Sequence, residues 1–437
     1  MRVKIDVGRR VSRLKQGETY TKTQLHSVIG FSEKTLDRII NTMIKKEMFI
    51  RDGDNYIIKK TGKCVMSFDA DVLATNPIET FITAMQENHK GDVTLQIMGL
   101  LSALTPWMRT DNMNIYATGS SSAGKTHALG TILKYIPKPY YFTVTSKSEK
   151  SIYYAVKSGY IGSNAILMFD DIDAYNKFLH NLKTLSWASD IKPSHWSVNT
   201  HKFFHIDIDK EFVFWLTSIY PVNNVEIQNR FVFVNVNEDE IHKETVKDFI
   251  IKKYCFGAEA EDDTSTIHKL QDAFTLLTYI LNGKKIVIPY KLDVNISNTR
   301  SIIQFLVTVK AITAFNIFKR KVVNNCIISE KSDIEMAIKL WEEFYPNSLP
   351  RHIMKTYNAL SVKNGTDKYT LANKLGISPR TVLRHINYLS ERGLVGFQYK
   401  NKHTYYYKKN THKLDIKIKS KEVKYGNKRF NWTIQRN

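Results

Sequence analysis

Residues 119–126 carry the pattern G-x-x-x-x-G-K-S/T. Two glycines flank four small residues, and a lysine and a threonine follow the second glycine. The eight residues are Gly119, Ser120, Ser121, Ser122, Ala123, Gly124, Lys125 and Thr126. An apolar run, 114–118, precedes the loop, and a helix-like stretch, 127–135, follows it. A buried strand, such a loop and a helix in this order form a phosphate-binding site, because the loop N–H groups and the positive end of the helix surround the phosphates. We therefore expect an α/β fold built around a nucleotide-binding core.

The closing residues of the loop predict the cofactors. Lys125 would contact the terminal phosphates of ATP, and the Thr126 hydroxyl would bind Mg²⁺. The alternative is a glycine-serine turn with an incidental lysine, which the agreement of strand, loop and helix disfavours.

Acidic residues follow a second apolar strand, which is predicted over 165–169. Asp170 is placed to hold Mg²⁺ together with Thr126. Asp171 occupies the position where a glutamate usually orients the attacking water, and its side chain is one methylene shorter. Three alternatives stay open: the loop brings Asp171 closer, hydrolysis is slow, or Asp173 takes part.

Two further residues complete the predicted hydrolysis site. A third strand, 212–216, ends in Thr217 and Ser218, and a polar residue there can orient the water beside the γ-phosphate. Thr217 is the preferred candidate. Arg230 stands directly before the next apolar strand, 231–236. An arginine so placed often reaches the nucleotide of a neighbouring subunit and stabilises transferred charge there, although a lone surface arginine is more often an ion-pair partner.

Charge is distributed unevenly along the 437 residues, whose net charge is +22. Residues 1–62 carry a net +7, residues 63–350 a net −1 and residues 351–437 a net +16. Basic ends around a neutral middle favour binding to a polyanion such as DNA, because lysines and arginines on phosphates release condensed counterions. A solvated basic surface is the plainer alternative.

Both ends have the element order of a winged helix-turn-helix. In residues 1–62, helices over 21–29 and 32–46 precede a hairpin, and the second helix exposes a mixed set of charges. We expect protein contact and DNA contact to be equally plausible for this end.

The C-terminal copy, within 351–410, is more basic. A helix over 370–375, the turn at Gly376 and a second helix beginning at Ser378 and Pro379 precede a wing around 400–402. Leu383, Ile386 and Leu389 are predicted to face inward. The candidates for DNA contact are Arg380, Thr381, Arg384 and His385 on the outward face of the second helix, and Lys400 and Lys402 in the wing.

Composition excludes several other classes of protein. No apolar run approaches the roughly 18 residues that a membrane span needs, and the first residues lack the apolar segment of a signal peptide, so we expect an intracellular protein without a membrane partner. Cys64, Cys255 and Cys326 are far apart in sequence, which disfavours a zinc site or a disulfide framework.

Taken together, these motifs resemble the AAA+ ATPases, and within them the branch of MCM-like replicative helicases and related phage and plasmid ATPases. The resemblance covers residues 93–325. That branch places a β-hairpin before the third strand, and 196–199 and 203–208 alternate like paired strands here. The resemblance implies that Lys202, aided by His201, lies at the hairpin tip and follows a DNA strand through a central channel. It also implies that Arg300, at the start of a lid helix, is a second sensor arginine.

The predicted domains are a winged helix-turn-helix (1–62), a helical lead-in (63–113), an AAA+ ATPase domain with lid (114–325), a helical linker (326–350), a winged helix (351–410) and a basic tail (411–437). The resemblance implies a ring, of six subunits, that hydrolyses ATP to move on or unwind DNA during replication. Two alternatives stay open: an origin-binding initiator or helicase loader that uses ATP as an assembly switch, and an ATP-controlled transcription regulator. No MCM-type oligonucleotide-binding or zinc module is evident at the N-terminal end.

Overall fold

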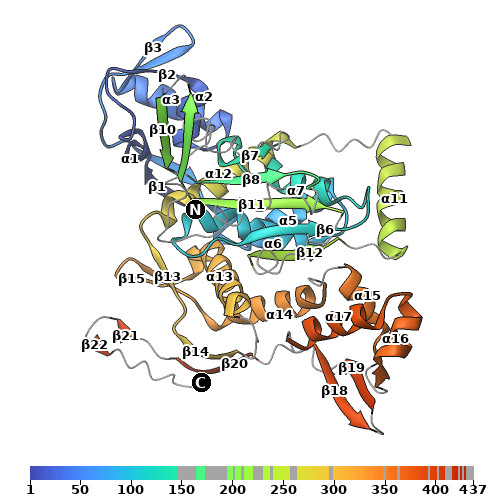
Figure 1. Cartoon of the computed structure of the whole chain (residues 1–437). Coiled ribbons are helices and arrows are strands. Elements are labelled where there is room, and N and C mark those ends of the chain that lie inside the picture. The colour runs from blue at the N-terminus through green and yellow to red at the C-terminus, as the bar shows by residue number, and fades with distance from the viewer. Residues whose placement is uncertain are drawn as a thin grey trace.

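A parallel sheet forms the centre of the molecule. The computed structural model describes residues 1–144, 164–172, 194–199, 202–207, 211–219, 230–236, 240–255, 263–294, 299–347, 351–361, 365–391, 394–400, 403–408, 416–421, 424–425 and 428–429. The five strands lie in the order β12-β6-β11-β8-β7 and all run in the same direction (Figure 1). They are β6 (Asn114–Thr118), β7 (Tyr141–Val144), β8 (Asn164–Phe169), β11 (Glu211–Ser218) and β12 (Phe231–Asn235). The predicted α/β core is therefore present.

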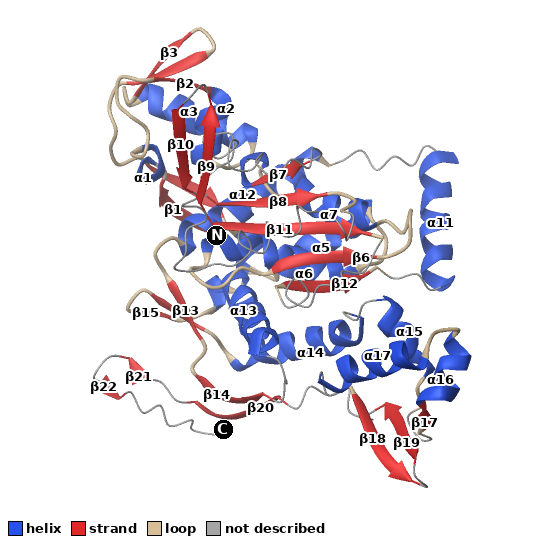
Figure 2. Cartoon of the chain, viewed as in Figure 1, coloured by secondary structure: helices blue, strands red, loops and turns tan. Residues whose placement is uncertain are grey.

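The strands are apolar on both faces. Described helices pack against the face that carries Ile115, Ile166 and Trp215 (Figure 2). The elements in contact with the strands include α6 (Val93–Leu104), the short η1 (Thr105–Trp107), α7 (Lys125–Lys134) and η2 (Lys138–Tyr140). Helix α5 (Pro77–Asn88) packs against α7. Helix α6 packs against both α5 and α7. Trp215 of β11 is fully buried, and its indole N–H donates to the Ser102 hydroxyl of α6 at 2.9 Å, which fixes the helix against the sheet.

The lead-in segment differs from its prediction at its beginning. Residues 65–69 form a strand, β5 (Val65–Asp69), which pairs antiparallel with β1 (Arg2–Asp6). The expected helices follow as α4 (Asp71–Ala74), α5 and α6. The helical prediction for the whole of 63–113 was wrong at β5 because its pairing partner lies about sixty residues away in sequence, beyond the reach of local periodicity.

The N-terminal module, defined as α1–α3 with β2–β4, has the element order that the sequence predicts. Its elements are α1 (Gly8–Val11), β2 (Thr19–Thr21), α2 (Lys22–Ile29), α3 (Glu33–Lys45), β3 (Phe49–Asp52) and β4 (Asn55–Ile58). Thr21 caps α2 through a reciprocal pair of hydrogen bonds with Gln24, and Ser32 caps α3. Strands β2, β4 and β3 form a small antiparallel sheet beside the helices.

This module is docked onto helix α12 (Thr264–Leu281). The Asp272 carboxylate accepts a hydrogen bond from the Ser32 backbone N–H at 2.8 Å and another from the Thr35 hydroxyl. The Phe31 N–H donates to the Thr275 hydroxyl at 3.1 Å. The beginning of α3 is therefore bound to the core that contains the parallel sheet.

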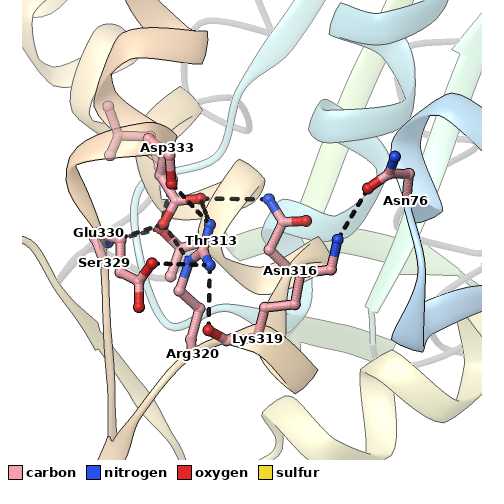
Figure 3. Close-up of polar contacts among 10 residues, drawn as sticks. Asn76, Thr313, Asn316, Lys319, Arg320, Ser329, Glu330 and Asp333 are labelled. Carbon is pink, nitrogen blue, oxygen red and sulfur yellow. Dashed lines mark hydrogen bonds and ion pairs between the residues drawn. The ribbon is translucent and has the colours of Figure 1, made fainter.

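A lid-like region follows α12. It comprises β13 (Lys285–Val287), β14 (Tyr290–Val294), α13 (Thr299–Phe315), η3 (Ile317–Lys319), β15 (Val322–Val323), β16 (Cys326–Ile328) and α14 (Lys331–Asn347). A buried ion pair holds it together: Arg320 donates to both carboxylate oxygens of Asp333, at 2.7 and 2.5 Å (Figure 3). Thr313, Asn316 and the Glu330 N–H also donate to Asp333, so the buried charge is fully compensated.

The C-terminal module is defined as α15–α17 with β17–β19. Its elements are α15 (Arg351–Ala359), β17 (Thr366–Asp367), α16 (Lys368–Leu375), α17 (Pro379–Glu391), β18 (Val395–Lys400) and β19 (His403–Lys408). Asp367 caps α16, and Gly376, at φ 65°, ends it in the left-handed conformation. These bounds match the predicted helices and hairpin.

The remaining described elements are a hairpin, one helix and the strands of the tail. They are the hairpin β9 (Ser194–Asn199) and β10 (Lys202–Asp207), helix α11 (Glu240–Cys255), and the tail strands β20 (Ile416–Lys421), β21 (Lys424–Tyr425) and β22 (Lys428–Arg429). Strand β20 pairs antiparallel with β14, so part of the basic tail returns to the lid-like region.

Candidate nucleotide-binding and hydrolysis site

The phosphate loop connects β6 to α7 at the carboxyl edge of the sheet. Strand β6 is buried along its whole length, which fixes where the loop begins. Gly124 lies at φ 85° immediately before α7, a left-handed conformation that glycine adopts without steric cost. The Ala123 N–H donates to the Ser120 carbonyl at 3.3 Å. The loop is thus a tight turn that leads into a helix N-terminus, which is the geometry of an anion site.

Lys125 is held inside this loop. Its side chain is largely buried, and the Nζ donates to the carbonyl oxygens of Ser120 at 2.6 Å and Gly119 at 3.1 Å. The loop therefore positions the ammonium group where a bound polyphosphate would lie.

Asp170 collects hydroxyl groups from two other segments. Its Oδ1 accepts from the Thr126 hydroxyl at 2.5 Å and from the Thr217 hydroxyl at 2.6 Å. Burial alone raises the pKa of the Asp170 carboxyl, but these two hydrogen bonds, the backbone N–H of Asp171 and the charge of Lys125 together outweigh burial and lower the pKa below its ordinary value. The group is a carboxylate at physiological pH.

Thr126 and Asp170 fit a magnesium ion. A hydroxyl and a carboxylate supply the hard oxygen ligands that Mg²⁺ prefers, and Mg²⁺ commonly takes its other ligands from phosphates and water. Within the described residues there is no cluster of three or more histidine, cysteine or acidic side chains that could hold a metal. Bound there, Mg²⁺ would neutralise phosphate charge.

Thr217 lies between the phosphate loop strand and the acidic strand. In the sheet register it pairs with Ala117 of β6, and the preceding Leu216 pairs with Phe169 of β8. Its hydroxyl donates to Asp170 and accepts from the Asp171 N–H at 2.9 Å. Ser218, the second candidate, is buried and donates to the Ile172 carbonyl. The geometry therefore favours Thr217 as the residue beside the reacting group.

Asp171 has an exposed side chain and a backbone φ of 48°. This left-handed conformation is uncommon outside glycine, and aspartate is among the residues that tolerate it best. Asp173, the third acidic candidate, lies outside the described residues.

The two arginine candidates lie apart from the phosphate loop in sequence. Arg230 precedes β12, whose first residue pairs with Asn114, the first residue of β6, and its carbonyl accepts from the Asn114 side chain at 3.3 Å. Arg230 is therefore at the amino edge of the sheet, opposite the phosphate loop of its own chain. Arg300 is half-buried in the first turn of α13; its sensor role stays a prediction.

The predicted hairpin is present as β9 and β10, with Lys202 paired to Asn199. Lys202 is therefore the first residue of β10. His201 lies outside the described residues.

A histidine network that the sequence did not suggest lies beside the phosphate loop. His89 Nδ1 is 2.8 Å from His127 Nδ1, and His89 Nε2 is 3.0 Å from the Asp92 carboxylate. A Cβ added to Gly124 would lie 3.4 Å from the His89 ring. His242 of α11 comes within 3.8 Å of Asp92. His127 directly follows the motif, but its partners lie on other elements, so no local pattern connects them.

In the C-terminal module, three of the predicted DNA contacts have the expected exposure. Arg380 and Arg384 are exposed on α17, and Lys400 is exposed at the end of β18. Thr381 is half-buried, and its N–H and hydroxyl both engage Ser378 at the helix start. Lys402 lies outside the described residues.

The prediction that His385 faces outward was wrong. Its side chain is 3% exposed, and Nδ1 is 2.7 Å from the Thr356 hydroxyl of α15. Val382, His385, Ile386 and Leu389 form the buried stripe, whereas Leu383 is half-buried. Burial, followed by the proximity of His352 and Arg384, lowers the pKa of His385 to about 4. It is a neutral core residue.

Comparisons with known proteins agree with the loop geometry. A family model described as the MTBMA_p00010 P-loop domain matches residues 68–278. The middle of the chain is therefore similar to a P-loop domain, which supports nucleotide binding. An uncharacterized protein of Methanothermobacter marburgensis, MTBMA_p00010, is 24% identical to this chain over 418 residues, which cover 85% of this chain and 52% of the relative. The chain thus spans about half the length of the curated relative that it matches. Among the described residues, no helix is long and apolar enough to cross a membrane.

Proposed function

We propose that this protein is a DNA-dependent ATPase similar to the MCM-like AAA+ helicases, which assembles as a ring of six and uses hydrolysis to move on or unwind DNA during replication. Two features of the core support this proposal. Strand β11, which carries Thr217, lies between the phosphate loop strand and the strand that ends at Asp170. The hairpin β9–β10 precedes β11 in the chain, as the resemblance requires.

The position of Arg230 is the observation that supports assembly into a ring. Arg230 lies beside the first residue of β6, whereas the phosphate loop follows the last residue of that strand. The five residues of β6 span about 16 Å. An arginine at that distance does not contact the γ-phosphate of its own chain. It would contact a γ-phosphate bound by a neighbouring copy, and so complete a site at the subunit boundary.

In this scheme the chain's own groups perform distinct tasks. Lys125 binds the terminal phosphates, and Thr126 and Asp170 hold Mg²⁺. Thr217, fixed by its hydrogen bonds to Asp170 and the Asp171 N–H, orients the attacking water. Arg230 of the adjacent copy stabilises negative charge as the phosphoryl group departs.

Helix α11 supports self-association near the nucleotide. It lies beyond the carboxyl ends of the parallel strands (Figure 1), and its Phe249 ring is 5.5 Å from the Lys90 ammonium group. Ile250, Ile251 and Tyr254 are 47%, 42% and 78% exposed. A group of exposed apolar side chains marks a protein contact more often than a free surface.

Complementation between two inactive variants tests the shared site. Lys125→Ala should abolish ATP turnover, whereas Arg230→Ala should abolish turnover and keep nucleotide binding, because the arginine acts on charge that develops during transfer. Mixing the two should restore part of the activity, since a Lys125→Ala copy can lend Arg230 to an intact phosphate loop. The double variant, mixed with either parent, is the control for assembly.

Two outcomes would contradict the shared site. One is normal turnover by Arg230→Ala; the other is no recovery in the mixture although size-exclusion chromatography shows mixed assemblies.

Strand displacement on a forked DNA tests the helicase itself. Lys202→Ala should keep ATP turnover and lose unwinding, because a lysine at the hairpin contacts phosphate without reading bases. Lys339→Ala, which removes an exposed lysine from α14, should unwind normally. Turnover without unwinding by the wild type would count against the helicase.

An origin-binding initiator or helicase loader is the second candidate. The net +16 of residues 351–437 and the exposed Arg380 and Arg384 favour duplex binding at this end. Protection of one duplex sequence that is insensitive to Lys202→Ala would support this reading over the helicase.

A further inference from the structure

A cavity of about 580 Å³ lies between the N-terminal module and the ATPase core, at the end of the sheet away from the phosphate loop. Asn164 and Glu211, the first residues of β8 and β11, line it from the core, together with Trp107 and Arg109. Arg10 and Arg13 line it from the module. Its volume is in the range of small-molecule sites.

The lining has an excess of positive charge. Three arginines contribute to it, and Glu211 is the one acidic side chain among the lining residues that the structure describes. Glu211 accepts a hydrogen bond from the Asn112 side chain at 3.1 Å. A cavity with this charge balance attracts anions.

Arg10 is the unusual member of the set. It is 7% exposed, and its guanidinium donates to the Tyr140 hydroxyl at 2.5 Å, to the Thr278 hydroxyl at 2.8 Å and, at 3.5 Å, to the Ile29 carbonyl. It also lies 3.6 Å from the centre of the Tyr279 ring. Every one of these partners is formally neutral.

No carboxylate of the described residues compensates this buried charge. Burial raises the pKa of the Tyr279 phenol, so Tyr279 stays neutral and does not supply a counter-charge. Buried charges in proteins are normally paired with an opposite charge. An anion in the adjoining cavity would provide the missing charge for Arg10.

Two further features indicate what kind of anion fits. Guanidinium groups match the geometry of phosphate oxygens, and an aromatic ring beside them suits a nucleobase. Trp107 is half-buried and lies 4.9 Å, centre to centre, from the Tyr140 ring. Arg109 has a backbone φ of 50°, a conformation that costs energy for a long side chain and is concentrated at functional sites.

We propose that this cavity is a second, non-hydrolytic site for a nucleotide phosphate, either a free mononucleotide or one unit of a nucleic-acid strand, held by Arg10, Arg13 and Arg109 beside Trp107. Residues of the module and the core contribute together, so the ligand would strengthen the docking of the module. The site is independent of ATP hydrolysis at the phosphate loop.

Titration calorimetry on the full chain, with the phosphate loop saturated by Mg²⁺ and ADP, tests the site. The two probes are thymidine monophosphate and a short oligothymidylate. Arg13→Gln combined with Arg109→Gln should weaken binding of at least one probe by about tenfold, because two charge-assisted contacts are lost. Both side chains are exposed, so the variant should fold; a circular dichroism spectrum identical to that of the wild type verifies this.

The matched control is Arg9→Gln combined with Arg51→Gln. It removes two exposed arginines of the same module that do not line the cavity, and it should leave binding unchanged. Loss of thymidine monophosphate binding would identify a free nucleotide, and loss confined to the oligonucleotide would identify a strand. Equal affinity of the wild type and the cavity variant for both probes, or equal weakening by the control, would overturn the proposal.

ATP turnover measured on the same samples separates this inference from the proposed function. Absent turnover with intact, arginine-dependent binding would refute the ATPase and leave the second site standing.

Discussion

The two terminal modules share an order of elements and differ in what their second helix does. In the N-terminal module the beginning of α3 is bound to Asp272 of α12, and its exposed positions alternate between acidic and basic residues, with Asp37 in an ion pair with Lys22 at 2.7 Å. In the C-terminal module α17 exposes Arg380 and Arg384. The same arrangement of helices thus serves as a structural support in one place and offers a basic surface in the other.

Substitutions of the glycine in the helix-helix turn of each module would measure how tightly that turn packs against its surroundings. Gly30 has a φ of 74°, and an added Cβ would lie 2.2 Å from the Tyr140 hydroxyl of the core. Gly376 has a φ of 65° with no atom within 4 Å. Gly30→Ala should therefore cost roughly 3–5 kcal/mol through strain and overlap, and Gly376→Ala about 1–2 kcal/mol through backbone strain alone.

Chemical denaturation of the two variants, with hydrogen exchange to localise the loss, checks this comparison. Equal destabilisation by the two substitutions would show that the N-terminal module is not pressed against the core.

DNA affinity sharpens the comparison further. Arg380→Gln combined with Arg384→Gln should lower duplex affinity by at least about tenfold and reduce the salt dependence by roughly two counterions. Lys34→Gln combined with Arg38→Gln, the corresponding exposed pair on α3, should change affinity little. Fluorescence anisotropy over a series of salt concentrations measures both. A larger loss from the α3 pair would reverse the roles assigned to the modules.

Acid should act on the C-terminal module through His385. Its pKa is about 4 in the folded protein and ordinarily 6.5, so between these values the unfolded chain binds the proton more readily than the folded one. The contribution of neutral His385 to the free energy of unfolding is present above pH 6.5. It is lost as the pH falls toward 4, by about 1–3 kcal/mol. His385→Asn should flatten this dependence.

Hydrogen exchange of α15 and α17 between pH 7 and pH 5 measures the effect. His26 of the N-terminal module also has a pKa lowered by burial, so α2 is the internal comparison. Unchanged acid sensitivity in His385→Asn would contradict the assignment.

The positions of site residues could be predicted best where a sequence motif coincides with the end of a predicted strand. Thr126, Asp170 and Thr217 meet at one carboxylate oxygen, as expected when parallel strands end at the same edge. Long-range pairings were not predictable: β1 with β5, the module with Asp272, and His89 with His127 each join segments that share no local pattern.

The error at His385 has a different cause. The helix was predicted correctly, but its buried stripe was placed one residue too far along at Leu383. The spacing of Val382, Ile386 and Leu389 puts His385 inside. We interpreted a polar residue on an apolar stripe as a surface residue, although its ring is buried and Thr356 lies within hydrogen-bond distance of its Nδ1.

The pairing of β20 with β14 has a mechanical consequence. The C-terminal module is attached through α14 on one side and through a seven-residue connection to β20 on the other, and such a connection extends no further than about 29 Å. A domain tethered at both ends pivots but does not swing far from the lid. In the proposed function, DNA bound by this module would lie close to the lid-like region, and a movement of that region would be transmitted to it.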